Sequence, residues 1–317
     1  MSYVKNKECD EAHSQLHKLN SAPLGSDRSQ PIALSDKDSK SSPSTPTPKV
    51  SCFTTCMGRR HHLEQTLRRN LEWNKDYQNA EFVLLDYNSG DRLGDWIRDE
   101  MWEYIQSGLL VYYRYEESDF FKYSHSRNLA ARLCRGEIIC NLDADNFTGQ
   151  DFLFYIEEQM ETTDFLVGCE FDGKKFSPIE RIEGDYGTTG RMAVRRQHFL
   201  EAGGYDESMV AWGYEDMDLF HRISLAGFNC QSIDHRFLDC IVHGDEERIA
   251  NTEEKYIGRG GAAEDGSLVR HIGVSKNNIA QGKLVANQGN FGCGNVVKNF
   301  TGEQLSLTPI HVSDQNP

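Results

Sequence analysis

From residue 50 onward the chain alternates short apolar runs with amphipathic segments, whereas residues 1–49 show no sustained hydrophobic period. Leu63, Leu67 and Leu71 repeat at every fourth position, which is the spacing of one helix face. The apolar runs of strand length cover residues 50–55, 81–86, 109–115 and 137–142, and the helical segments between them cover 60–73, about 91–105 and 124–134. This alternation predicts an α/β fold, in which a mostly parallel sheet carries helices on both faces.

The alternation becomes less regular after residue 150. The predicted helices cover residues 151–160, 196–202 and 215–225, and the predicted strands cover 164–169, 188–194, 229–233 and 239–243. Beyond residue 243 the chain is rich in glycine and has few apolar runs. We therefore predict a disordered or extended tail over residues 1–49, a core domain over 50–245, and a lid or substrate-side extension over 246–317.

Charge, cysteine content and hydropathy narrow the class of protein. The formal net charge of −15 disfavours unaided binding to nucleic acid, because both partners would be polyanions. The nine cysteines include no C-x-x-C pair, which favours buried free thiols in a reducing compartment over a disulfide framework. Residues 1–20 are polar throughout, and the longest apolar run, 108–113, is too short to span a bilayer. We expect a soluble cytoplasmic protein without a transmembrane segment, whose membrane contact would be peripheral, at the inner face.

Two carboxylates, Asp143 and Asp145, directly follow the apolar run 137–142. The carboxyl ends of parallel strands are where open α/β sheets bind ligands. An Asp-x-Asp at such an edge suits a hard divalent cation and the diphosphate that the cation neutralises. The same pair can also cap backbone amides in a turn. We predict that Asp145 ligates a metal and that Asp143 contacts a ribose or a metal-bound water.

Three further segments meet the same predicted edge. Asp86 ends the second strand, where its carboxylate would either accept the N3–H of a uracil ring or cap a turn. Thr55 and Arg59 lie at the first strand–helix junction, where backbone amides and a guanidinium can meet a nucleotide, although Arg59 could equally be a solvated residue. Arg127 opens a helix that points at this edge. We predict that these four residues bind a nucleotide together with Asp143.

Residues 212–218, Trp-Gly-Tyr-Glu-Asp-Met-Asp, place acidic side chains at the start of the predicted helix 215–225. Acidic residues in a first turn also favour the helix dipole, but this does not account for Trp212 and Gly213. An aromatic ring offers a sugar an apolar stacking face, and a glycine lets the backbone approach closely. We predict Asp216 as a general base and Glu215 as the residue that holds an acceptor hydroxyl.

His243 ends the apolar run 240–242. A lone histidine after a strand is commonly structural, but the Asp-x-Asp favours metal binding through an imidazole nitrogen. Together with Asp145 and diphosphate oxygens, His243 would suit Mn²⁺, or Mg²⁺ in its place.

A metal–diphosphate site beside a general base predicts glycosyl transfer from a UDP-sugar donor to a hydroxyl of a glycan or glycoconjugate acceptor. Two other classes stay open. A nucleotidyltransferase would also hold a metal and a diphosphate, but would not need Trp212 beside a base. A non-catalytic nucleotide-sugar-binding module would bind the donor without turnover.

Together these motifs resemble the inverting GT-A glycosyltransferases over residues 50–245, both the bacterial family 2 and the β-1,4-galactosyltransferases. The most specific match is Gly-Gly-Tyr-Asp-Glu at 203–207 followed by residues 212–218, which is similar to a galactosyltransferase segment Trp-Gly-Gly-Glu-Asp-Asp-Asp. Asp86 matches the uridine-contacting aspartate of family 2. Asp143 and Asp145 match the Asp-x-Asp of both groups.

The resemblance implies a Rossmann-like GT-A fold, a donor sugar of the galactose or N-acetylhexosamine type, and a role in polysaccharide biosynthesis. It puts Gly190 in a donor-sugar loop at 186–190 and makes His243 a metal ligand, with Cys240 where a methionine ligand stands. Tyr214 replaces a glycine, which would narrow the acceptor cleft. Retaining N-acetylgalactosaminyltransferases have Trp-Gly-x-Glu-Asn in this place, so Asp216 favours inversion.

Overall fold

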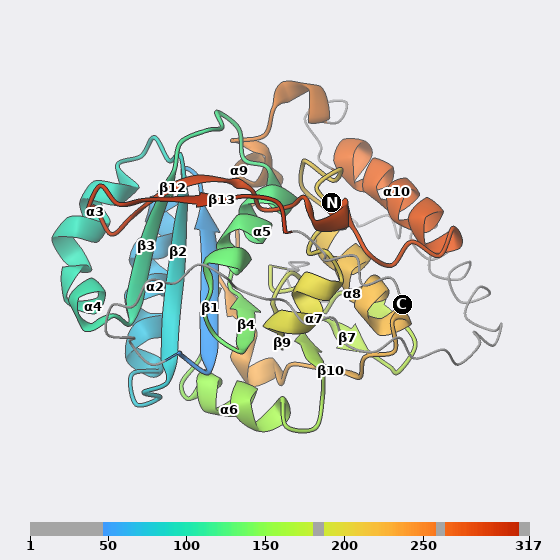
Figure 1. The fold of residues 1–317 in the computed structure, drawn as a ribbon, viewed down its shortest axis with the longest axis horizontal. Coiled ribbons are helices and arrows are strands. Elements are labelled where there is room, and N and C mark those ends of the chain that lie inside the picture. Colours follow the sequence, from blue (N-terminus) through green and yellow to red (C-terminus); the bar gives the residue numbers. More distant parts are fainter. Residues whose placement is uncertain (1–46, 180–186, 258–263, 311–317) are drawn as a thin grey trace.

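The computed structural model describes residues 47–179, 187–257 and 264–310. Within these residues a nine-stranded sheet lies between two layers of helices, which confirms the predicted α/β class (Figure 1). The strand order is β10-β6-β9-β4-β1-β2-β3-β12-β13. The strands are β1 (Val50–Cys56), β2 (Ala80–Tyr87), β3 (Leu110–Tyr115), β4 (Ile138–Asn141), β6 (Phe165–Val167), β9 (Met192–Arg195), β10 (Cys230–Ser232), β12 (Gly294–Lys298) and β13 (Gln304–Leu307).

Helices cover both faces of the sheet because successive strand residues point to opposite sides. On one face, Phe53 and Leu85 pack with α5, α7 and α8; on the other, Cys52 and Leu84 pack with α2, α3, α4 and α6. The helices are α2 (Arg60–Trp73), α3 (Leu93–Glu100), α4 (Trp102–Ser107), α5 (Tyr123–Leu133), α6 (Phe152–Gln159), α7 (Arg196–Glu201), α8 (Glu215–Leu225), α9 (Asp245–Ile249) and α10 (Val269–Ala280). The helix predicted over about 91–105 is therefore two helices, which are separated by the buried Met101.

The sheet is parallel in its centre and antiparallel toward both sides. Strands β4, β1, β2 and β3 run parallel, as does the pair β10–β6. Strand β9 is antiparallel to both β4 and β6, and β12 is antiparallel to β3 and β13. The carboxyl ends of β1, β2 and β4 therefore meet at one edge, as the sequence predicts for the nucleotide site.

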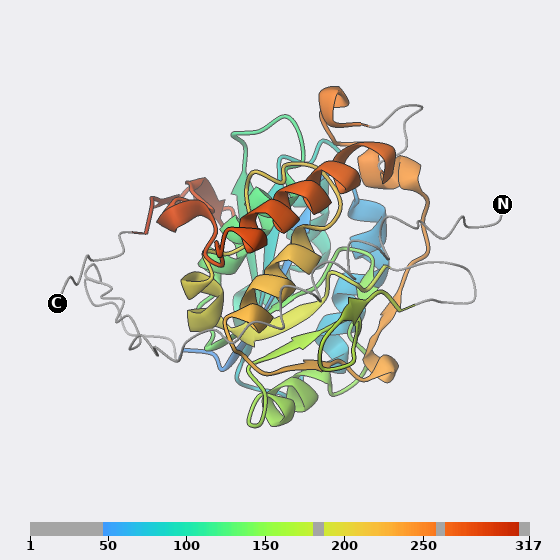
Figure 2. The same ribbon diagram turned by 90° about the vertical axis from the view of Figure 1, so that its right-hand side faces the viewer.

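The C-terminal segment contributes to this sheet. Residues 246–317 are predicted to form a lid or extension, but β12 pairs with β3, and Val296 and Phe291 are buried in the core. Helix α10, in contrast, lies across α8 on the outside of the molecule (Figure 2). Of the tail predicted over residues 1–49, residues 1–46 lie outside the described residues, as do the loop residue Tyr186 and the glycines at 258–263.

Eight cysteines lie within the described residues and are free thiols; seven of these are buried, as predicted. In the same part of the chain, none of the helices has both the length and the apolar character needed to cross a bilayer.

Candidate active site

A short antiparallel pair brings the predicted metal ligands together. Strand β5 (Asn146–Phe147) follows Asp145, and β11 (Asp239–Cys240) precedes His243. The Ile241 amide also donates to the Asp145 carbonyl at 2.8 Å. As a result, Nε2 of His243 lies 3.2 Å from Oδ2 of Asp145, and both side chains are about 95% buried, with exposed fractions of 5%.

The contacts of His243 are compatible with a cation between these two atoms. Its Nδ1 lies 3.3 Å from the Gly244 carbonyl, an acceptor, and in the tautomer with the ring proton on Nδ1 the Nε2 atom carries a lone pair. Nε2 faces the Asp145 carboxylate at 3.2 Å, and Nη1 of Arg59 lies 3.2 Å from the same nitrogen. A nitrogen and an oxygen ligand in this arrangement suit Mn²⁺. The donor set therefore fits the predicted metal, and Arg59 supplies positive charge beside it.

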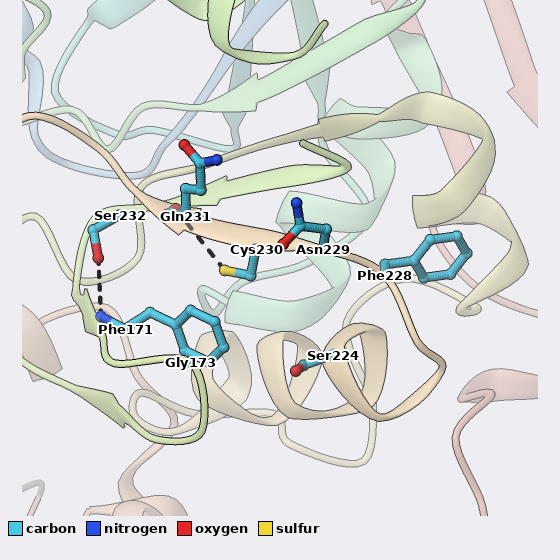
Figure 3. Close-up of a pocket in the computed structure, with 8 residues that line it drawn as sticks. All are labelled: Phe171, Gly173, Ser224, Phe228, Asn229, Cys230, Gln231 and Ser232. Atoms are coloured by element: carbon cyan, nitrogen blue, oxygen red, sulfur yellow. Dashed lines mark hydrogen bonds between the residues drawn. The ribbon is translucent and has the colours of Figure 1, made fainter. Parts of the chain in front are cut away.

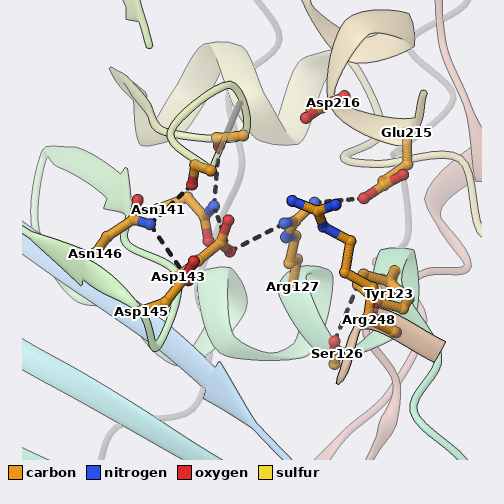
Figure 4. A network of polar contacts seen from close by, with 12 residues as sticks. Tyr123, Ser126, Arg127, Asn141, Asp143, Asp145, Asn146, Glu215, Asp216 and Arg248 are labelled. Atoms are coloured by element: carbon orange, nitrogen blue, oxygen red, sulfur yellow. Dashed lines mark hydrogen bonds and ion pairs between the residues drawn. The ribbon is translucent and has the colours of Figure 1, made fainter. Parts of the chain in front are cut away.

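Arg127 connects the two acidic motifs. Its guanidinium donates to Oδ1 of Asp143 at 2.9 Å and to Oε1 of Glu215 at 2.6 Å, so that it lies between the two carboxylates (Figure 4). Helix α5 places it there, and only 6% of Arg127 is exposed. The sequence predicts Arg127 as a nucleotide ligand; in the structure its two terminal nitrogens bind protein carboxylates.

Glu215 is also occupied by protein donors. Besides Arg127, the Gly213 amide donates to its Oε2 at 2.8 Å, and only 2% of the residue is exposed. The predicted contact with an acceptor hydroxyl would require this buried carboxylate to be reached. The geometry instead makes Glu215 a residue that positions Arg127 and the start of α8.

The pKa values of the three carboxyl groups differ because of this arrangement. Although burial opposes it, the charge and hydrogen bond of Arg127 hold the pKa of Asp143 below its ordinary value. Burial raises the pKa of Glu215, against the charge of Arg127. Burial, followed by the negative charge of Glu215, raises the pKa of Asp216 to about 7. Among these three, Asp216 is the group that can exchange a proton near neutral pH.

Gly190 lies beside the space that Arg127, Asp143 and Asp216 all face. A Cβ atom on Gly190 would lie 3.2 Å from Nη2 of Arg127, 3.2 Å from Oδ2 of Asp143 and 3.3 Å from Oδ2 of Asp216. The Gly190 carbonyl accepts from Asn141, at the end of β4, at 2.9 Å. The glycine thus keeps open the space where the Asp-x-Asp motif and the start of α8 meet.

The Trp212–Gly213 backbone is held by the segment around α10. The Ser267 hydroxyl donates to the Trp212 carbonyl at 2.5 Å, and Nδ1 of His271 donates to the Gly213 carbonyl at 2.6 Å. The Trp212 ring is half-buried and lies under the Arg248 guanidinium, 5.5 Å from it. Gly213 has a φ of +105°, a conformation that favours glycine.

Tyr214 does not narrow an acceptor cleft as predicted. It takes the left-handed conformation at the start of α8, with a φ of +72°. Its side chain is 6% exposed and belongs to the core, where its ring stacks against His221 at a centroid distance of 6.3 Å.

Asp86 is fully buried at the end of β2. Its Oδ1 accepts from the Ser89 amide at 2.8 Å, while its Oδ2 accepts from the Tyr112 hydroxyl at 2.7 Å and from Arg114 at 2.6 Å. Of the two roles left open by the sequence, turn capping is present in the structure. A base contact would require one of these donors to leave. Thr55, the other strand-end candidate, is 8% exposed at the end of β1.

Two residues at this edge, His61 and Glu247, were not predicted. Glu247 lies in α9, and its side chain contacts both His61 and His62, while its backbone carbonyl accepts from Arg59 at 2.7 Å. Burial and the charge of His61 lower the pKa of His62 to about 4, so its imidazole is neutral at pH 7. The adjacent histidines at a strand–helix junction were the available sequence signal.

A cavity of about 470 Å³ lies elsewhere, between α8, β10 and β7 (Glu170–Phe171) (Figure 3). Phe171, Phe228 and Gln231 are among its lining residues, and none of the candidate site residues lines it. The candidate site is therefore defined by convergent polar side chains and not by this cavity.

Comparison with known protein families agrees with this site. Residues 51–205 match glycosyl transferase family 2, and residues 175–243 match the N-terminal domain of galactosyltransferase. The first match contains the Asp-x-Asp motif, and the second contains Gly190, the start of α8 and His243. The resemblance predicted from the motifs is confirmed.

Individual relatives are distant. The chain is 25% identical over 117 residues to a probable N-acetylgalactosaminyltransferase 9 of Caenorhabditis elegans, which covers 32% of this chain and a fifth (20%) of that protein. Among solved structures, a mannosyltransferase from Pyrobaculum calidifontis in complex with GDP-Man and Mn²⁺ is 17% identical, with a TM-score of 0.49, over 74% of this chain and 66% of that one. TarS 1–349 of S. aureus in complex with UDP-GlcNAc is 14% identical, with a TM-score of 0.49, over 65% and 62%. On the strength of the two family matches, residues 51–243 form a glycosyltransferase domain.

Proposed function

We propose that this protein is an enzyme, a metal-dependent inverting glycosyltransferase that moves a sugar of the galactose or N-acetylhexosamine type from a UDP-sugar to a hydroxyl of a glycan. The observation that carries the proposal is Asp216. Its pKa is raised to about 7, and its Oδ2 faces the same space beside Gly190 as Asp143 and Arg127. A general base is most effective when its pKa lies near the working pH.

In the proposed reaction, Asp216 takes the proton of the acceptor hydroxyl through Oδ2. The hydroxyl oxygen attacks the anomeric carbon from the face opposite UDP, the bond between that carbon and the diphosphate oxygen breaks, and the bonding electrons leave with UDP. Oδ1 of Asp216 accepts from the Met217 amide at 2.7 Å, which fixes the carboxylate at the start of α8. Glu215 and Arg127 act as positioning residues, because they hold α8 against the Asp-x-Asp loop.

The donor end of the proposed site consists of Asp145, His243 and Arg59. A divalent cation held by Asp145 and His243 would neutralise the charge that develops on the leaving diphosphate. Arg59 binds an anion by charge-assisted hydrogen bonds, and we assign it to the diphosphate. Asp143 would accept from a ribose hydroxyl on the other side of the Asp-x-Asp loop.

The acceptor end would be built around the half-buried Trp212 ring. Its backbone is fixed by Ser267, and the neighbouring Gly213 by His271. An aromatic face of this kind suits the apolar face of a sugar ring. The name of the worm relative is consistent with an N-acetylhexosamine donor. The buried free thiols favour a reducing compartment, and on that basis we propose a cytoplasmic enzyme.

The decisive experiment is a screen of UDP-sugars for UDP release with and without Mn²⁺, on wild-type protein and on Asp216→Asn. We expect release with one sugar class, dependence on the metal and loss in the variant. Pyrophosphate release from nucleoside triphosphates would instead favour a nucleotidyltransferase. Donor affinity without release, under every acceptor tried, would favour a binding module.

A further inference from the structure

Three side chains from distant parts of the chain converge beside the proposed donor site. His61 and His62 lie in the first turn of α2, and Glu247 lies in α9. Oε2 of Glu247 is 3.2 Å from Nε2 of His61 and 3.2 Å from Nε2 of His62. In the described parts of the chain this is the one group of three or more metal-ligating side chains, and its ligand atoms all lie within 4.8 Å of one another.

The separations of Glu247 from the two histidines, 3.2 Å each, match those between ligands of a tetrahedral metal. Zn²⁺ binds imidazole nitrogen and carboxylate oxygen at about 2.0–2.2 Å, which places neighbouring ligand atoms about 3.3 Å apart at the corners of a tetrahedron. The two contacts of 3.2 Å lie at the long end of N–H···O hydrogen bonds but close to this value. Two histidines and one glutamate are also a ligand set that binds zinc with a fourth position open.

The group is accessible from solvent on one side only. The side chains of His61 and Glu247 are 56% and 42% exposed, whereas that of His62 is 3% exposed. A metal would therefore enter past His61 and Glu247 and complete its contacts at the buried His62. An exposed ion pair between Glu247 and one histidine would contribute little by itself.

This group is distinct from the pair Asp145–His243, although the two are neighbours. The rings of His62 and His243 are 5.2 Å apart, and neither Asp145 nor His243 is part of the three-residue group. The link between them is α9, which starts two residues after His243 and carries Glu247.

We propose that His61, His62 and Glu247 form a second metal site, which takes a divalent transition metal of the zinc class. Bound metal would tie the start of α2 to α9, two segments that are more than 180 residues apart in sequence. Because α9 follows His243 directly, occupation of this site would stiffen the segment that carries His243. The proposal rests on the group itself and stands whether or not the donor is a UDP-sugar.

The test is a Co²⁺ titration of the full, tag-free chain, followed by visible absorption, since four-coordinate Co²⁺ absorbs more strongly than six-coordinate Co²⁺. The variants are His61→Ala and Glu247→Gln, with His235→Ala as the matched control, because His235 is an exposed histidine paired with Glu170 at 2.9 Å. Asp145→Asn serves to remove the neighbouring pair. Melting curves in EDTA check that each variant folds like the wild type.

We expect a four-coordinate spectrum that survives in Asp145→Asn and in His235→Ala. His61→Ala and Glu247→Gln should each lower the affinity of this four-coordinate site for Co²⁺ by roughly 10- to 100-fold. Losses of this size are found even when outer-shell partners of metal sites are mutated. Zn²⁺ should displace the Co²⁺ and raise the melting temperature of the wild type more than that of His61→Ala. Unchanged affinity in both His61→Ala and Glu247→Gln would overturn the proposal, and so would loss of the spectrum in Asp145→Asn alone.

Discussion

Replacement of Asp216 by asparagine tests the proposed base with little change in shape. Asparagine keeps an oxygen for the Met217 amide, which donates to Asp216 at 2.7 Å, but cannot take a proton. A positioned general base contributes about 10²–10⁴-fold to turnover. We therefore expect the variant to lose about 3–5 kcal/mol of transition-state stabilisation, at 1.36 kcal/mol for each factor of ten. Asp95→Asn, an exposed first-turn aspartate of α3, is the matched control.

The raised pKa of Asp216 provides a second, independent test of its role as general base, through the pH dependence of turnover. With a pKa of about 7, half of the molecules carry a deprotonated base at pH 7 and about one in eleven at pH 6. The rate of UDP release should thus fall roughly fivefold between pH 7 and pH 6 in the wild type. An aspartate with its ordinary pKa would give no such change in this range. The residual rate of Asp216→Asn should not follow this profile.

The melting temperature measured as a function of pH shows whether Asp216→Asn folds like the wild type. Because the folded-state pKa of Asp216 lies above its unfolded value, this group contributes stability below the unfolded pKa, and that contribution is lost as pH rises through about 7. Asp216→Asn cannot ionise, so its melting temperature should equal or exceed that of the wild type above pH 7. If Asp216→Asn keeps its turnover within about tenfold of the wild type, with unchanged UDP affinity, Asp216 is not the general base.

Three other substitutions separate the roles assigned to the site. Asp145→Asn should abolish the Mn²⁺ dependence of UDP binding in calorimetry, because it removes one of two ligands; metal-dependent binding at wild-type affinity would contradict this. Arg127→Met should lower the free energy of unfolding by about 3–5 kcal/mol in urea titrations, because it leaves Asp143 and Glu215 unpaired; a variant of wild-type stability would show that the bridge is not structural. Asp86→Asn should likewise lower stability by about 3 kcal/mol, because a buried partner of Arg114 is lost. If Asp86→Asn instead keeps its stability and loses only its preference for UDP over CDP, the base-contact role is correct.

The central strands were predictable because each is a continuous apolar run that is buried on both faces. The predicted runs 50–55 and 81–86 fall within β1 and β2, and 137–142 contains β4, so the placement of Asp143 just past β4 followed from sequence. The outer strands were not predictable in the same way. Strand β12 offers only Val296 and Val297 as apolar residues, and its pairing with β3 depends on contacts more than 180 residues apart.

The sequence predicts the two metal ligands of the candidate site, but not the backbone element that brings them together. Asp145 and His243 were linked by ligand chemistry and by the family resemblance, and the element that joins them, the β5–β11 pair, has two residues in each strand. No period can be detected in so short a run. Tyr214 was misplaced because its direction depends on a left-handed φ of +72° that the sequence does not specify.

The balance of charge at the site explains why a cation is expected before the donor. Asp143, Glu215 and Asp216 lie around Arg127 and Gly190, Asp145 follows in the same Asp-x-Asp motif, and Arg127 is already shared between Asp143 and Glu215. A diphosphate brought to this set without a metal would meet net negative charge, in a chain whose overall charge is −15. Arg59 alone cannot balance it, and in the structure it lies against His243, where a metal would bind. Metal binding at Asp145 and His243 would repel Arg59 and turn its guanidinium toward an incoming phosphate. This argues for ordered binding, in which the metal precedes or accompanies UDP, and UDP affinity measured without metal should be much weaker than with it.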